Sequence, residues 1–213
     1  MPYRRKYRKR RRRRFRRRRG LTTRQAAFRA LSRVDPEKKA IDVATQGNPV
    51  VVSITTPSII GLNLLAEGAS NDDRIGKQAK MLSIQGRILS EVTAGDSYIR
   101  GFILLDRQPN GAFPTLANIL ANSTTDPFNS PMNLQSNKRL KILHTWVMRN
   151  DTQSFSQKAH HFYKKLHFTT RYTLTTAGIN SIGTNSLLAV FVCNEAVLNA
   201  PTVQFHFRLR FVG

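Results

Sequence analysis

The residues of this chain that are most capable of specific chemistry gather at its amino end. Between Met1 and Arg19 stand fourteen arginines and lysines and no acid. Like charges at this density repel one another and do not fold around a core. They instead neutralise the phosphates of nucleic acid, where each contact releases a counterion. We therefore expect nucleic acid to be the partner of this basic arm, residues 1–20.

The predicted phosphate contacts are the basic residues of the arm and of the segment that follows it. Arginine predominates over lysine, which suits two-pronged contacts to phosphate. Tyr3, Tyr7 and Phe15 interrupt the cations and are candidates for stacking on unpaired bases. No groove-reading motif accompanies them, so we expect binding that is largely independent of base sequence. The predicted nucleic-acid-binding residues are Arg4, Arg5, Lys6, Arg8, Lys9, Arg10, Arg11, Arg12, Arg13, Arg14, Arg16, Arg17, Arg18, Arg19, Arg24, Arg29 and Arg33.

The rest of the chain has an ordinary composition. Residues 34–213 hold 18 basic residues and all 12 acids, enough sequence for one domain with its own core. Cys193 is the single cysteine, which excludes an internal disulfide, and no apolar segment typical of a signal peptide or membrane span follows the arm. We therefore expect an intracellular protein with no membrane insertion. The arm also resembles a nuclear localisation signal, which predicts nuclear import receptors as partners and the host cell nucleus as a location.

The elements that would position these residues fall into three parts. After the arm, residues 21–35 predict a short amphipathic helix, with Thr22 and Gln25 as a capping box and Asp35-Pro36 as its stop. Arg29 and Arg33 lie opposite its apolar stripe. This helix either presents arginines to phosphates or covers the core, and both readings stay open. Residues 36–213 form the third part, the predicted domain.

That domain has the pattern of an antiparallel β-sandwich. Several runs are rich in β-branched residues or alternate between apolar and polar residues, with turn-rich stretches between them. In the last run Val203, Phe205, Phe207, Leu209 and Phe211 share one face, and Leu82, Ile84 and Ile88 share one face of an earlier run. One short helix is expected after Pro114. The sequence therefore predicts an all-β fold, a single jelly roll of about eight strands, with strands at 50–56, 80–92, 98–105, 139–149, 162–174, 186–193 and 202–212.

The candidates for catalysis or metal binding are weak. Cys193 lies in an apolar strand pattern, typical of a buried thiol rather than a nucleophile. His160 and His161 are adjacent, so on a strand they point to opposite faces. Asp72 and Asp73 lie in a turn-like loop that supplies too few oxygens for a closed cation site. We therefore expect no catalytic residues, no cofactor and no assignable metal site, and we predict that the chain is not an enzyme.

The order of these features resembles the coat proteins of satellite tobacco necrosis virus and its relatives. The resemblance is carried by GASNDDRIGKQAKMLSIQGRI, FILLDRQPNGAFPTLANIL and NLQSNKRLKILHTWVMRND, at residues 68–88, 102–120 and 133–151. The arm is similar instead to those of capsid proteins from circular single-stranded DNA viruses, the circovirus-like group. The resemblance implies a jelly roll that assembles as a sixty-subunit (T=1) icosahedral shell with its arms facing inward. It also implies calcium at the subunit contacts of the satellite relatives, whose ligands match no particular residues here.

The expected function is that of a viral capsid protein, located in the virion, that packages single-stranded nucleic acid through its arm. The genome is expected to be circular DNA rather than RNA because of the resemblance of the arm. The alternative is a monomeric nucleic-acid-binding protein of the ribosomal or chromatin type, with a basic tail on a β-sandwich. The alternative predicts no particles and a basic patch on the surface of the domain.

Overall fold

The structure of the protein is a computed structural model that describes residues 37–92, 95–151 and 157–213. The arm and the helix expected at 21–35 therefore lie outside the described residues. From Glu37 to Gly213 the chain forms one compact unit, built from two antiparallel sheets. No helix within the described residues is long and apolar enough to cross a membrane.

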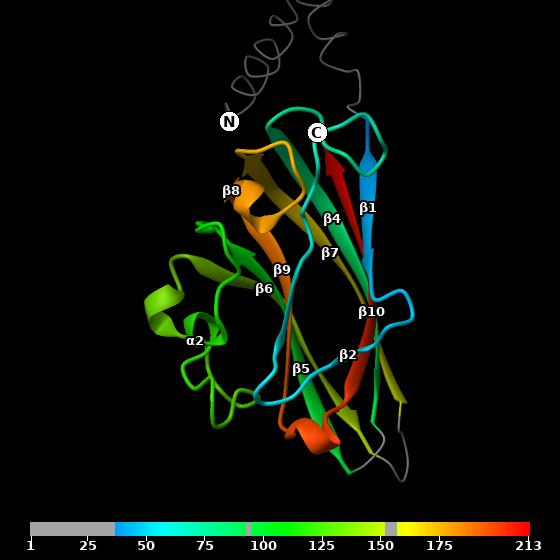
Figure 1. Cartoon of the computed structure of the whole chain (residues 1–213), viewed down its shortest axis with the longest axis vertical. Helices are drawn as coiled ribbons and strands as arrows, with labels where there is room; N and C mark the ends of the chain where they lie inside the picture. The colour runs from blue at the N-terminus through cyan, green and yellow to red at the C-terminus, as the bar shows by residue number, and fades with distance from the viewer. Residues whose placement is uncertain (1–36, 93–94, 152–156) are drawn as a thin grey trace, which may run out of the picture. The chain divides into compact units, whose positions relative to one another are not determined.

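The larger sheet, sheet A, contains the most strongly alternating strands. Its order is β1-β10-β4-β7-β8, and the two-residue β2 pairs with β10 beyond the end of β1 (Figure 1). The bounds of these strands are β1 Lys39–Ala44, β2 Val50–Val51, β4 Gln78–Glu91, β7 Gln157–Tyr172, β8 Ile182–Thr184 and β10 Thr202–Val212.

The smaller sheet, sheet B, has the order β3-β9-β5-β6. Its central strands β5 and β9 are buried along most of their length, and every residue of β9 is buried. A strand that is buried on both faces reads as a continuous apolar run, as Leu187 to Cys193 does. The bounds are β3 Ser58–Gly61, β5 Ser97–Asp106, β6 Leu140–Asn150 and β9 Ser186–Cys193.

The path of the chain between the sheets defines a jelly roll. With β1 and β2 taken as one edge and the short β8 set aside, eight strands remain. They visit the sheets in the order A, B, A, B, B, A, B, A, and each sheet receives four of them. Consecutive strands thus mostly lie in opposite sheets, as in two interleaved Greek keys. The predicted all-β jelly roll is confirmed.

Apolar side chains from the two inner faces fill the space between the sheets. The alternation expected in the last strand is confirmed, since Val203, Phe205, Phe207, Leu209 and Phe211 are all buried in this core. Their neighbours in β10 therefore point away from the core.

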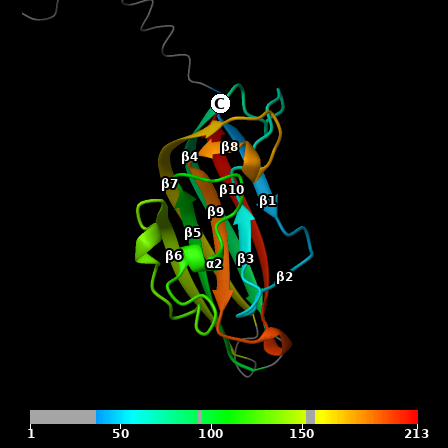
Figure 2. The same cartoon turned by 60° about the vertical axis from the view of Figure 1, so that its left-hand side comes forward.

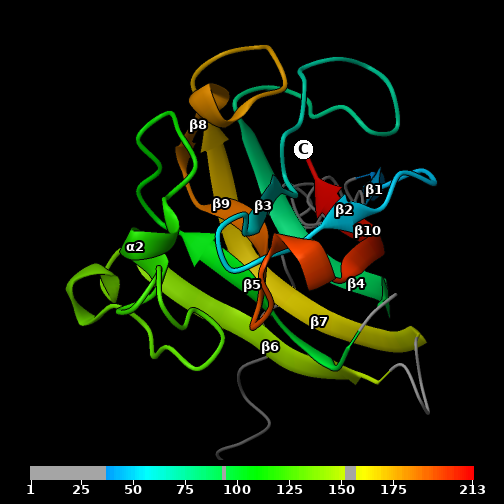
Figure 3. The same cartoon turned by 60° about the horizontal axis from the view of Figure 1, so that its bottom comes forward.

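The outer face of sheet B is covered by the long connection between β5 and β6. This connection carries α2 (Leu116–Ile119) and η1 (Leu134–Ser136), and α2 lies on the side of sheet B in Figures 2 and 3. Leu116, Ile119 and Leu120 pack on Phe102 and other residues of sheet B in a second apolar cluster. The helix expected after Pro114 is thus present, and among the described residues sheet A alone offers a broad outer face of strands. Two further 3₁₀ turns are η2 (Ile179–Ser181) and η3 (Val197–Asn199).

Two details of the sequence prediction were wrong. The strand expected at 50–56 ends at Val51, because the Ser53 hydroxyl accepts a hydrogen bond from the backbone N–H of Thr56 and closes a turn before Pro57. Leu82 is only half-buried, because a bulge between Met81 and Ser83 shifts the register and puts Met81 in the core. The strands β1, β3 and β8 were not predicted.

Candidate nucleic-acid interface

The residues that the sequence nominates for contact with nucleic acid all precede Glu37. From Tyr3 to Arg33 they lie outside the described residues and stay predictions. The described unit carries cations of its own, however, and these gather on the outer face of sheet A.

Strand register brings these cations together. In β10 the residues between the buried positions face outward, and the paired residues of β4 and β7 face outward with them. We call this surface the cationic face. Within the described strands its acids are Asp42 and Glu91, and its cations are Lys80, Arg87, Lys165, Arg171, Arg208 and Arg210.

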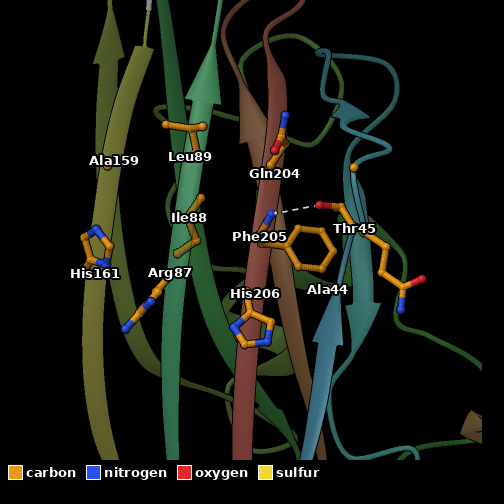
Figure 4. A pocket seen from close by; sticks show the side chains of 12 residues that line it. Ala44, Thr45, Arg87, Ile88, Leu89, Ala159, His161, Gln204, Phe205 and His206 are labelled. Carbon is orange, nitrogen blue, oxygen red and sulfur yellow. Dashed lines mark hydrogen bonds between the residues drawn. The ribbon is translucent and has the colours of Figure 1, made fainter.

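One row of this face combines an arginine with two imidazoles. Arg87 of β4 is paired with His206 of β10 on one side and with His161 of β7 on the other, and Ala44 of β1 extends the row (Figure 4). Side chains directly opposite each other in antiparallel strands stand about 5 Å apart at Cβ. Among the described residues the Arg87 guanidinium meets no hydrogen-bond or ion-pair acceptor, so its donors face solvent.

The next row is partly neutralised. Arg208 donates two hydrogen bonds to Asp42, from Nε to Oδ1 at 2.8 Å and from the terminal nitrogen to Oδ2 at 2.6 Å. His206 Nε2 lies 3.5 Å from the same carboxylate. The guanidinium of Arg208 holds the pKa of Asp42 below its ordinary value. Both oxygens of Asp42 are thus engaged, which leaves Arg87 as the cation with unused donors in these two rows.

A tight turn forms the rim of a hollow beside this row. Asn48 N–H donates to Thr45 O at 2.9 Å, and both central residues of the turn, Gln46 and Gly47, have positive φ angles of 47° and 86°. Glycine adopts such angles at little cost, which suits the second position. The Thr45 hydroxyl also accepts a hydrogen bond from the backbone N–H of Phe205 at 3.3 Å (Figure 4). The turn is therefore held against the end of the sheet.

Two hollows lie on the cationic face. The larger, of about 440 Å³, is lined by the turn, by Arg87 and His161, and by small or apolar side chains such as Ala44, Leu89 and Ala159. The smaller, of about 150 Å³, is lined by Gln85, Arg87, His206 and Arg208. Chemically, this arrangement offers hydrogen-bond donors and positive charge to an anion beside an apolar surface.

The other candidates from the sequence lie elsewhere. Cys193 is fully buried as expected, and burial raises the pKa of its thiol to about 11, so the thiolate needed for nucleophilic attack is scarce at neutral pH. Asp73 accepts a hydrogen bond from Ser70 N–H at 3.3 Å within its own loop, and Asp72 is exposed there. Within the described ranges no three or more histidines, cysteines or acids gather as metal ligands.

The adjacent histidines do point to opposite faces. His161 lines the larger hollow, whereas His160 faces inward and its ring lies 5.3 Å from that of Trp146, with the planes nearly parallel. His144 of β6 also lies beside His160, and the Nε2 atoms of the two imidazoles are 3.4 Å apart. The indole has room because Gly101 lacks a side chain: a Cβ there would lie 2.2 Å from Trp146. These rings form an aromatic cluster where the sheets meet.

The cationic face was missed by sequence reasoning, although part of its signal was present. Alternation in the last strand already placed Gln204, His206, Arg208 and Arg210 on one face. The partners Arg87 and His161 come from strands that are distant in sequence, and their register decides which of them adjoin. Comparison with known proteins adds no further residue: no protein-family model matches the chain, and no curated protein matches it either.

Proposed function

We propose that this chain is a viral capsid protein whose jelly roll assembles into a closed shell of sixty copies and whose arm condenses single-stranded nucleic acid. The observation that carries the proposal is the joining of fourteen cations, without one acid, to a jelly-roll unit. The arm has the charge to hold a polyanion, and the sandwich supplies a rigid body that can tile with its own copies. The resemblance to satellite-type coat proteins favours the same function.

The cargo proposed is circular single-stranded DNA, on the resemblance of the arm to those of circovirus-like capsid proteins. The same arm supports a role as nuclear localisation signal, with the host nucleus as the place of assembly. Nuclease treatment of purified particles tests the cargo. Protected nucleic acid that is degraded by DNase after the shell is opened supports DNA, and degradation by RNase alone contradicts it.

A second candidate function is that of a monomeric nucleic-acid-binding protein. The cationic face is compatible with it, because such a protein needs a basic surface on its folded body. A capsid protein uses such a face equally well if the face lines the interior. The presence of the face therefore does not separate the two functions, and the oligomeric state does.

Size-exclusion chromatography with light scattering tests the proposal directly. The purified full-length chain, at several salt concentrations and pH values and with single-stranded DNA supplied, is expected to elute as particles of more than about a megadalton, close to sixty times 24.2 kDa. Electron microscopy is expected to show closed shells of uniform diameter. A protein that stays at 24.2 kDa under all of these conditions would be the monomeric alternative.

A further inference from the structure

The two hollows on the cationic face adjoin each other and share lining residues. Arg87 and His206 line both of them. One hollow is small and lined by cationic and polar groups, and the other is larger and lined in part by apolar atoms. A single molecule that occupied both would need an anionic group next to a flat, largely apolar one.

The smaller hollow has the chemistry of a phosphate site. Arg87 of β4 lies opposite His206 of β10 in one row, and Arg208 of β10 lies opposite Gln85 of β4 in the next, and all four side chains line the hollow. Guanidinium groups form strong, charge-assisted hydrogen bonds to phosphate oxygens. Asp42 would repel an anion, but its oxygens already accept hydrogen bonds from Arg208. Arg87, which has no acceptor among the described residues, is the group left to bind.

The larger hollow has the chemistry of a base site. Its strand surface is made of short or apolar side chains, Ala44, Leu89 and Ala159, and His161 and His206 border it on either side of Arg87 (Figure 4). Its volume is about 440 Å³, and the hollow is shallow and open to solvent, so a base could enter it from outside. Flat bases stack on imidazole and guanidinium planes, and any base has the π-face that this requires.

Further groups continue the same chemistry along the strands. Tyr163 is paired with Gln85, faces outward and is 57% exposed, so its ring is open to a second base. In the next row, Ser83 of β4 is paired with Lys165 of β7 on one side and with Arg210 of β10 on the other. These cations stand about 7 Å along the strands from the row of Arg208, since two residues of a strand span that length.

We propose that the cationic face binds a single-stranded polynucleotide, with one phosphate at Arg87, beside the Asp42-bound Arg208, and the adjoining base in the hollow over Ala44, Leu89 and Ala159. The next base stacks on Tyr163 and a later phosphate reaches Lys165 and Arg210. The proposal rests on nucleic acid as the cargo and names a second contact with it, in addition to the arm. It predicts little preference for base sequence, because stacking and phosphate contacts carry the binding.

Photo-cross-linking of the full-length protein tests this site apart from the arm. The probe is a single-stranded oligodeoxynucleotide that contains 5-iododeoxyuridine, and mass spectrometry then locates the cross-linked residues. We expect cross-links at His161, Tyr163 or His206 besides those in the arm. Arg87→Ala is expected to lower the yield at these three residues about tenfold, the factor that one charge-assisted hydrogen bond carries, and to leave the arm cross-links unchanged.

Two further variants make the test specific. Arg149→Ala is the matched control, since it also removes an exposed strand arginine. Arg149 lies on β6 of sheet B and pairs with Asp96, and its removal is expected to leave all cross-links unchanged. Ala159→Leu fills the larger hollow without a change of charge and is expected to lower the yield at His161. Thermal unfolding of each variant confirms its fold before cross-linking.

The outcomes separate this site from the proposed function. Cross-links confined to the arm in the wild-type protein, or yields at His161, Tyr163 and His206 that Arg87→Ala does not change, would overturn the site. Shells that still formed and retained DNA in that case would leave the capsid function standing. Conversely, cross-links on the cationic face of a protein that stays monomeric would support the site and contradict the capsid function.

Discussion

His144 and His160 meet at their Nε2 atoms, 3.4 Å apart, at the edge where the two sheets come together. Burial lowers the pKa of both imidazoles; the charge of Lys164 adds to this for His144, and the charges of His144 and His161 add to it for His160. The folded state therefore favours the neutral pair, in which one ring can donate a hydrogen bond to the other. Protonation of both rings would set two like charges against each other beside Lys164.

This pair predicts a loss of stability in mild acid. Because the pKa is lower in the folded than in the unfolded state, protons bind the unfolded chain more readily as pH falls. The stabilisation is complete above about pH 6.5, the ordinary pKa of histidine, and is lost as pH falls through the lower pKa of the folded pair. We expect the melting temperature to fall less between pH 7.5 and 5.0 in a His144→Gln/His160→Gln double variant than in the wild type.

The control for this experiment is His167→Gln, which changes an exposed histidine on β7, the strand that also carries His160. It is expected to keep the pH dependence of the wild type. A double variant whose melting temperature fell as steeply as that of the wild type would show that other groups, such as the carboxylates, govern the response to acid.

The burial of Arg74 could not be predicted from the sequence. Its side chain is fully buried. It pairs with Glu67 at 3.2 Å, donates to the carbonyls of Leu65, Gly76 and Leu174, and stacks 4.3 Å from the centre of the Tyr172 ring. Composition favours an exposed arginine, whereas the structure gives this one enough acceptors to be buried.

At the scale of elements, the β5–β6 connection decides which sheet remains open. It packs Leu116, Ile119 and Leu120 against the outer face of sheet B, so that β5 and β9 are covered on both sides. The outer face of sheet A receives no such cover within the described residues. The cationic face is thus a consequence of where this connection lies.

The connection should contribute to stability through its buried side chains. Ile119→Ala removes a fully buried side chain and is expected to lower the free energy of unfolding by about 2–5 kcal/mol, from reduced apolar burial and the cavity left behind. Urea denaturation followed by the fluorescence of Trp146, the single tryptophan, measures this change. Leu134→Ala, in the same connection but 79% exposed, is expected to stay within about 0.5 kcal/mol of the wild type. Equal losses in both variants would contradict the packing described.

At the scale of the whole molecule, the acid-free run of cations and the described fold occupy different parts of the chain. The unit from Glu37 to Gly213 contains both sheets and both apolar clusters. Removal of the arm should therefore alter the binding of nucleic acid far more than it alters the melting temperature.

Deletion of residues 1–19 tests this division. The melting temperature is expected to change little, and the slope of log affinity for single-stranded DNA against log salt concentration to fall by roughly 0.7 for each phosphate that the arm no longer neutralises. A full-length variant with glutamine at all fourteen basic positions keeps the length of the arm and is expected to behave like the deletion. Retention of nuclease-resistant nucleic acid at the wild-type level by either variant would contradict the role of the arm.

Local patterns in the chain were enough to predict the all-β class, the jelly roll and most of the strands, because these follow from alternation with a period of two. The affinity of the arm for polyanions, inferred from like charges with no acids among them, stays a prediction. The same patterns did not reveal β1, β3 and β8, because short edge strands carry few alternating residues, nor the bulge beside Leu82.

The folded arrangement was needed to show that Arg87, His161 and His206 stand in one row, that Arg208 is held by Asp42 and that Arg74 is buried. Each of the first two depends on strands that are far apart in sequence, and a slip of one residue in their register would turn every side chain to the opposite face. Burial of the apolar faces of all the strands together sets that register, and the pattern of one strand alone does not contain it.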